Sequence, residues 1–135
     1  MKKTLLLLFT VVFMGCSSND DSNSDSNSNS SFNPPSWANG RWVEQTLKTI
    51  GYKFTSNDFI LIAGATEISI GGQIKTLINA GGEATINEEI KTSTEYKFSY
   101  TIQSITQHYH FVKVSNTEIK DQINDPNGYN LYVKQ

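Results

Sequence analysis

The segment Tyr96-Lys97-Phe98-Ser99-Tyr100-Thr101-Ile102-Gln103 decides the fold class. Its large apolar side chains stand at every second position, and polar side chains fill the positions between them. Successive side chains of a β-strand point to opposite faces, so this alternation predicts a strand with one buried and one solvated face. Strands of this kind are typical of antiparallel sheets that cover a core on one side only.

The same alternation recurs along the C-terminal hundred residues, up to a last stretch in which Tyr129, Leu131 and Val133 share a face. Clusters of Ser, Asn, Asp and Gly separate these stretches and carry the chemistry of turns. The pattern predicts eight to ten short strands. They lie near residues 40–47, 50–54, 58–63, 66–70, 73–79, 83–91, 95–103, 107–114, 117–123 and 128–134.

The segment 73–79 permits a second interpretation. Ile74, Leu77 and Ile78 have helical spacing, and Gly81 is placed to end a helix. However, such a helix has only about two turns and is marginal unless it packs. Because Ile74, Thr76 and Ile78 also fit the alternation of a strand, we expect a strand here.

Many short strands joined by short links favour a sheet that curls on itself, because closure removes the free edges that otherwise aggregate. We therefore predict an all-β fold, an antiparallel up-and-down barrel or a flattened barrel of eight to ten strands.

Length and charge narrow the class of protein. The chain has 135 residues, which is the length of a single domain. It has 11 Lys and Arg against 13 Asp and Glu, a formal net charge of −2. This balance provides no cationic field for phosphates, so we expect no nucleic-acid partner.

The N-terminus has the layout of a bacterial export signal. Lys2 and Lys3 precede ten uncharged, mostly apolar residues, 5–14, which are too few to cross a bilayer as a helix. The following Phe13-Met14-Gly15-Cys16 resembles the lipobox of bacterial lipoproteins, where the signal is cut before a cysteine that becomes lipid-modified. The resemblance implies a signal peptide at 1–15 and a membrane anchor on Cys16. The alternative is an ordinary secretory signal followed by a chance cysteine.

A polar stretch follows the cysteine. Residues 17–31 are all Ser, Asn or Asp and bury nothing, so we predict a disordered tether over 16–35 and a folded domain over 36–135. Ser18-Asn19-Asp20-Asp21 resembles the export signal that sends Bacteroidetes lipoproteins to the outer surface of the outer membrane. The alternative is a solvated spacer that carries no targeting signal.

Three stretches of the predicted domain resemble lipocalin-like proteins. Gly40-Arg41-Trp42 is similar to the Gly-x-Trp element that opens lipocalin barrels, and segments 51–59 and 111–119 resemble small lipocalin-like lipoproteins of gut Bacteroidetes. The resemblance implies a calycin-like barrel. In lipocalins an arginine of the last strand packs over that tryptophan, and here the last predicted strand offers Lys134.

Residues with catalytic or metal-binding chemistry are few. His108 and His110 would share one face of a strand, but a metal site needs a third or fourth ligand, so we favour two solvated side chains and no metal. A polar cluster, Asp121, Asn124, Asp125 and Asn127, lacks the spacing of a calcium loop and fits a turn. No nucleophile stands in a recognisable motif. We therefore expect a non-enzymatic protein without a cofactor.

Aromatic residues are the remaining candidates for a ligand site. They can line a pocket for a small apolar ligand or fill the barrel themselves, and the interior of a small barrel rarely does both. The candidate ligand-binding residues are Trp42, Tyr52, Tyr96, Phe98 and Tyr100. The sequence thus predicts a lipid-anchored, non-catalytic binding or accessory module of the cell envelope. The alternative is a packed interaction domain that contacts an envelope protein or a glycan through its surface.

Overall fold

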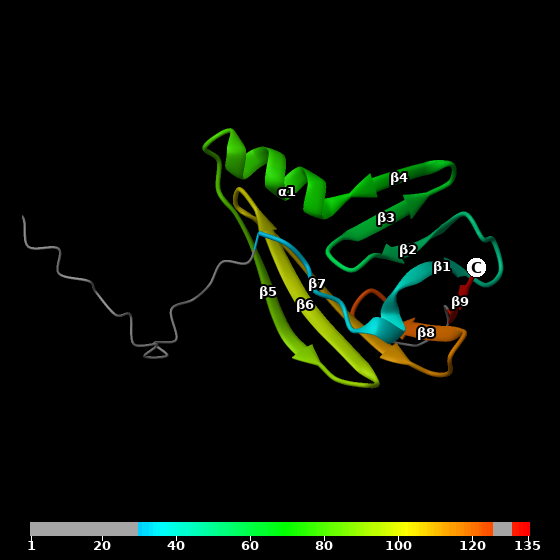
Figure 1. Cartoon of the computed structure of the whole chain (residues 1–135). Coiled ribbons are helices and arrows are strands. Elements are labelled where there is room, and N and C mark those ends of the chain that lie inside the picture. Colours follow the sequence, from blue (N-terminus) through cyan, green and yellow to red (C-terminus); the bar gives the residue numbers. More distant parts are fainter. Residues whose placement is uncertain (1–29, 126–130) are drawn as a thin grey trace, which may run out of the picture.

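A computed structural model describes residues 30–125 and 131–135 (Figure 1). This part of the chain holds nine strands, one α-helix and one short 3-10 helix. In chain order these elements are η1 (Ser36–Ala38), β1 (Gly40–Glu44), β2 (Ile50–Phe54), β3 (Phe59–Ala63), β4 (Thr66–Ser69), α1 (Ile70–Asn79), β5 (Ala84–Lys91), β6 (Glu95–Ile102), β7 (Ile105–Lys113), β8 (Glu118–Asp121) and β9 (Leu131–Lys134). The predicted all-β, barrel-like fold is confirmed.

All nine strands belong to one antiparallel sheet with the order β4-β3-β2-β1-β9-β8-β7-β6-β5. Strands that follow each other in sequence are neighbours, and β1 pairs with β9, so the meander closes where the two ends of the domain meet. The exception is β4 and β5, which form the two edges of the sheet and are separated in sequence by α1. The result is a curled half-barrel that is open along one side (Figure 1).

Aromatic rings fill the concave side of the sheet. The alternation of β6 places Tyr96, Phe98 and Tyr100 inside, where they are 0%, 0% and 7% exposed, while Lys97 lies on the outer face. The same side receives rings from β2, β3 and β7, and most neighbouring rings meet edge to face or tilted. Such contacts add to the free energy gained from burying the rings. The core is therefore an aromatic cluster.

The segment expected as a strand over 73–79 is a helix, so that prediction is wrong. The Ser69 side chain caps its first turn by accepting the Gly72 N–H at 2.8 Å, and the Asp58 carboxylate accepts the Gly71 N–H at 2.8 Å. Ile70 and Ile74 then face the core from successive turns. A helix of 10 residues is weak alone, but this one is capped at its start and packs on one face.

The open side of the half-barrel is closed by α1 and by residues 30–35, which we call the strap. The strap runs along the side of the sheet between α1 and β5 (Figure 1). Phe32 is 1% exposed, and Pro34 and Pro35 are also buried. Composition places these residues in the tether, yet they pack on the domain.

The phase of the last strand also differs from expectation. Tyr132 is the buried residue of β9, at 4% exposed, and faces Ile119 across the ladder, whereas Leu131 and Val133 are only half-buried on the other face. Within β9, Lys134 follows Tyr132 on the inner side, and its ammonium lies 5.0 Å from the centroid of the Trp42 ring. This is a cation–π contact between the last strand and the first.

Candidate functional site

The five predicted ligand-binding residues lie together in the aromatic core but do not enclose one space. Trp42, Tyr96 and Phe98 have no exposed surface, and Tyr100 and Tyr52 are 7% and 9% exposed. Trp42 is held by its indole N–H, which donates to the Ala38 carbonyl at 2.6 Å. Of the five, Tyr52 alone lines one of the described cavities.

That cavity, which we call the tyrosine cavity, has a volume of about 350 Å³. Three tyrosines, Tyr52, Tyr109 and Tyr132, form part of its wall, and Leu61 and Ile68 provide aliphatic surface. The remaining lining residues are Ile50, Gly51, Ile62, Ala63 and Asn124. The space is mostly apolar with a few polar groups, which is the usual composition of a small-molecule site.

A buried carboxylate organises the polar side of the tyrosine cavity. Asp121 is 0% exposed, and its side chain accepts the Tyr52 hydroxyl at 3.0 Å and the Asn124 side-chain amide at 2.7 Å. It also accepts the main-chain N–H groups of Ile123 and Asn124. A charge buried this deeply is tolerated because several donors surround it. Asp121 thereby fixes both the Tyr52 ring and the segment that follows β8.

The tyrosine hydroxyls of the cavity stay protonated at neutral pH. Burial, and secondarily the charge of Asp121, raises the pKa of Tyr52 above its ordinary value of 10.0. Burial likewise raises the pKa of Tyr109 and of Tyr132. Neutral phenols donate and accept hydrogen bonds but supply no phenolate as a base or nucleophile. The cavity is therefore equipped to orient a guest through hydrogen bonds.

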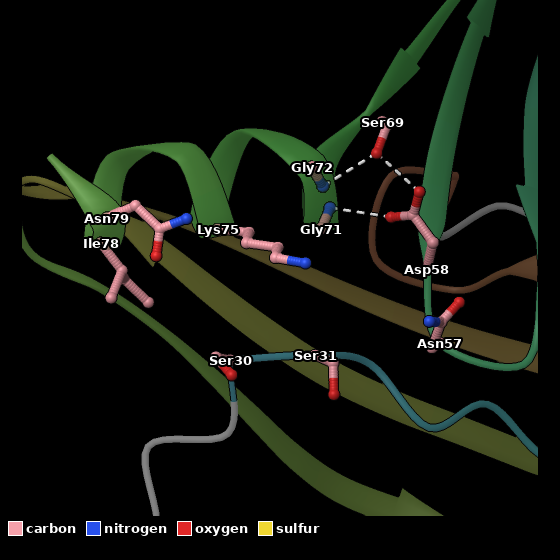
Figure 2. A pocket seen from close by; sticks show the side chains of 10 residues that line it. All are labelled: Ser30, Ser31, Asn57, Asp58, Ser69, Gly71, Gly72, Lys75, Ile78 and Asn79. Atoms are coloured by element: carbon pink, nitrogen blue, oxygen red, sulfur yellow. Dashed lines mark hydrogen bonds between the residues drawn. The ribbon is translucent and has the colours of Figure 1, made fainter.

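A second hollow is a polar groove of about 390 Å³ between α1 and the strap (Figure 2). Lys75 extends along it from α1, and Ser31 and Asn57 face it from other segments. Figure 2 also shows that Asp58 holds both the Ser69 hydroxyl and the Gly71 N–H. The N–H groups at the start of α1 are thus already hydrogen-bonded. Lys75 has no ion pair among the described residues.

The two histidines lie on the outer face of the sheet. His108 is exposed opposite Ser99, and His110 Nε2 lies 2.9 Å from Glu95 Oε2. Within residues 30–125 and 131–135, no three His, Cys, Asp or Glu side chains come close enough to hold a metal ion. Asp121, one member of the polar cluster considered for calcium, is instead bonded to Tyr52 and to its own loop. Asn127 lies outside the described residues.

Sequence reasoning missed Tyr109 and Tyr132 as cavity residues. Tyr109 follows the exposed His108 in a strand whose first half is exposed, so alternation there gives no clear inner face. The prediction that Tyr129, Leu131 and Val133 share a face leaves Tyr132 on the opposite one. Cys16, the predicted lipid attachment site, lies outside the described residues. In the described part of the chain, no helix is both long and apolar enough to span a membrane.

Comparisons with protein-family models, with curated proteins and with solved structures found no match to this chain.

Proposed function

We propose that this chain is a lipid-anchored lipoprotein of the cell envelope whose barrel-like domain is a non-catalytic binding module. Its ligand is a small apolar molecule with a polar group, held in the tyrosine cavity. The lipobox-like segment before Cys16 and the polar tether support attachment to the outer membrane, with the domain facing outward. The resemblance to lipocalin-like lipoproteins supports the same class of role.

One observation carries the binding role. The tyrosine cavity combines aromatic and aliphatic walls with the Tyr52 hydroxyl, which Asp121 holds in place. A rigid polar group that is fixed before binding costs less entropy when a ligand hydrogen-bonds to it. A single-ring guest with one hydroxyl therefore matches both the size and the chemistry of this space.

The test uses the full-length protein in lipid nanodiscs and 4-(trifluoromethyl)phenol as a probe, observed by fluorine NMR. Leu61→Trp places a bulky ring in the cavity wall and should weaken binding at least about tenfold, since the guest loses its space. Ile123→Trp, at a residue that is 40% exposed, is the matched control and should leave binding unchanged. Equal binding by both variants would refute the cavity as the site.

The membrane anchor is tested separately. Cys16→Ala should release the protein into soluble fractions of the cell, because the fatty chains that hold it are lost. Membrane retention equal to that of the unaltered protein would contradict the lipoprotein assignment, whatever the outcome for the cavity.

The packed aromatic core favours a second candidate function. The interior around Trp42, Tyr96 and Phe98 has no exposed surface, as expected of a domain that acts through its outside. In this case the domain binds an envelope protein or a glycan. If the probe binds neither the unaltered protein nor the control variant, this surface role replaces the tyrosine cavity as the proposed function.

A further inference from the structure

The strap is attached to the domain in a different way from the strands. Among the described residues, none of its main-chain groups bonds to a main-chain group of the sheet. Pro34 and Pro35 have no N–H to donate. The Asn33 N–H of the strap donates to Glu88 Oε1 at 2.8 Å and also acts on the Tyr96 hydroxyl. Burial of Phe32, Pro34 and Pro35 is therefore its main attachment.

The Phe32 ring occupies a slot made of other aromatic rings. Its centroid lies 5.3 Å from that of Phe98, 5.8 Å from Phe59 and 6.3 Å from Tyr100, and all three contacts are edge to face. Such a slot selects a flat ring, because each wall offers a ring face or edge at a fixed angle. Any small aromatic molecule that takes the place of Phe32 finds the same walls.

The polar groove of Figure 2 is lined by the start of the strap, and Ile74, the residue before Lys75 on α1, belongs to the same buried cluster as Phe32. Ser31, the residue before Phe32, lines the groove, and Lys75 faces it from α1. The alternation along the strap thus puts a polar side chain in the groove and the next ring in the core. Once the strap has moved aside, a molecule with its aromatic ring in the slot would extend toward α1 and the Lys75 ammonium, which has no described ion pair.

We propose that the slot filled by Phe32, together with Lys75 in the adjoining groove, is a binding site for small aromatic anions such as aromatic carboxylates. The ligand displaces the Phe32 ring and swings the strap off the open side of the half-barrel. Phe32 is thus an internal competitor that lowers the affinity of the closed protein. This inference rests on the proposed binding function but concerns a different place in the fold.

The first test uses the full-length protein in nanodiscs and 4-(trifluoromethyl)benzoate, observed by fluorine NMR. Phe32→Ala removes the competitor and should tighten binding about tenfold to a hundredfold. Phe54→Ala is the matched control, because Phe54 is 2% exposed but has no described ring contact with Phe32. If Phe32→Ala binds no more tightly than Phe54→Ala, the proposal fails. Phe32→Leu, a smaller change, should give an intermediate affinity if the alanine variant does not fold.

The second test separates charge from apolar fit. Lys75→Gln should weaken binding of the benzoate about tenfold but leave binding of the neutral 4-(trifluoromethyl)benzamide unchanged. An equal loss for both probes would contradict a role for the ammonium.

The third test follows the strap in the unaltered protein. Saturating benzoate should speed hydrogen exchange at the Asn33 amide, which loses its bond to Glu88, while amides in β6 keep their protection. Unchanged exchange at Asn33 with bound benzoate would refute displacement of the strap. Leu61→Trp blocks the tyrosine cavity and should leave all three results intact, so the two sites can fail independently.

Discussion

The paired wall and the unpaired wall of the half-barrel bury the same kind of side chain by different means. The paired wall is the sheet, where Phe98 belongs to a strand that is hydrogen-bonded on both sides, to β5 and to β7. The unpaired wall is α1 with the strap, where Phe32 belongs to a segment without described main-chain bonds to the sheet. Both rings are at most 1% exposed. Equal burial therefore does not mean equal local stability, because the cost of opening depends on what must be broken with it.

The largest predicted effect is a loss of stability at alkaline pH that originates in the paired wall. Burial raises the pKa of five tyrosines on its strands, Tyr52, Tyr96, Tyr100, Tyr109 and Tyr132. Their contribution to stability is complete below pH 10, where the unfolded phenols keep their protons, and is lost as the pH rises above it. Each tyrosine should lower the free energy of unfolding by up to about 1.4 kcal/mol per pH unit in that window.

Urea unfolding between pH 9 and pH 11.5 measures this loss, with tyrosinate absorbance at 295 nm as a second readout. Tyr100→Phe should reduce the slope by one titrating group. A slope that stays near zero up to pH 11.5 would show that these phenols are not buried in solution. The unpaired wall contributes nothing to this slope, since no tyrosine lies in the strap or in α1.

The second prediction compares one phenylalanine from each wall. Phe98→Ala should cost about 3–5 kcal/mol, because the surrounding strands are fixed and leave a cavity. Phe32→Ala should cost only about 1.5–3 kcal/mol, the value of burying the ring, because the strap can detach instead of holding an empty space open. Urea unfolding followed by tryptophan fluorescence gives both values. Equal losses would mean that the strap is as firmly fixed as the sheet.

The two walls also differ in how far sequence alone predicts them. Strict alternation from Tyr96 to Ile102 predicts a strand because period two has one structural solution, and the structure confirms the strand with Tyr96, Phe98 and Tyr100 inside. Ser99, expected on the solvated face, is buried at 8% exposed. Helix α1 was missed because its start depends on Asp58, which lies 13 residues before its partner Gly71 and across a turn. Phe32 was missed because one ring in a polar tract gives no period. Its burial depends on rings 27 and more residues away, such as Phe59.

The candidate site shows the same limit. Tyr52 was predicted because alternation in β2 puts it inside with Phe54. Tyr109 and Tyr132 join it only through the pairing of β1 with β9, which brings the first and last strands together. The position of the tyrosine cavity on the inner face depends on this strand pairing and on Asp121. The sequence predicts Asp121 only as part of a turn.

The third prediction concerns the helical part of the unpaired wall. Ser69 accepts the Gly72 N–H and donates to Asp58, so it connects the cap of α1 to the loop before β3. Ser69→Ala should cost about 1 kcal/mol in the free energy of unfolding. Thr76→Ala, at an exposed position inside α1, is the control and should change stability little. Native-state hydrogen exchange should show the loss in α1 before it shows in β6, and uniform loss across both would contradict the separation of the walls.

The smallest predicted effect concerns η1, the 3-10 helix that directly follows the strap. The Trp37 indole N–H donates to the Thr92 carbonyl at 2.8 Å, close to the turn between β5 and β6. Trp37→Phe keeps an aromatic ring but removes this donor, and the bond is exposed to water, so stability should fall by only about 0.5–1 kcal/mol. The informative measurement is hydrogen exchange at the Asn33 amide. Its rate should rise at least as much as the loss in the free energy of unfolding implies, because the strap loses the Trp37 hydrogen bond that follows it in the chain. An unchanged rate at Asn33 would show that the Trp37 bond does not stabilise the strap. It would sharpen the contrast with the sheet, whose strands are hydrogen-bonded to their neighbours.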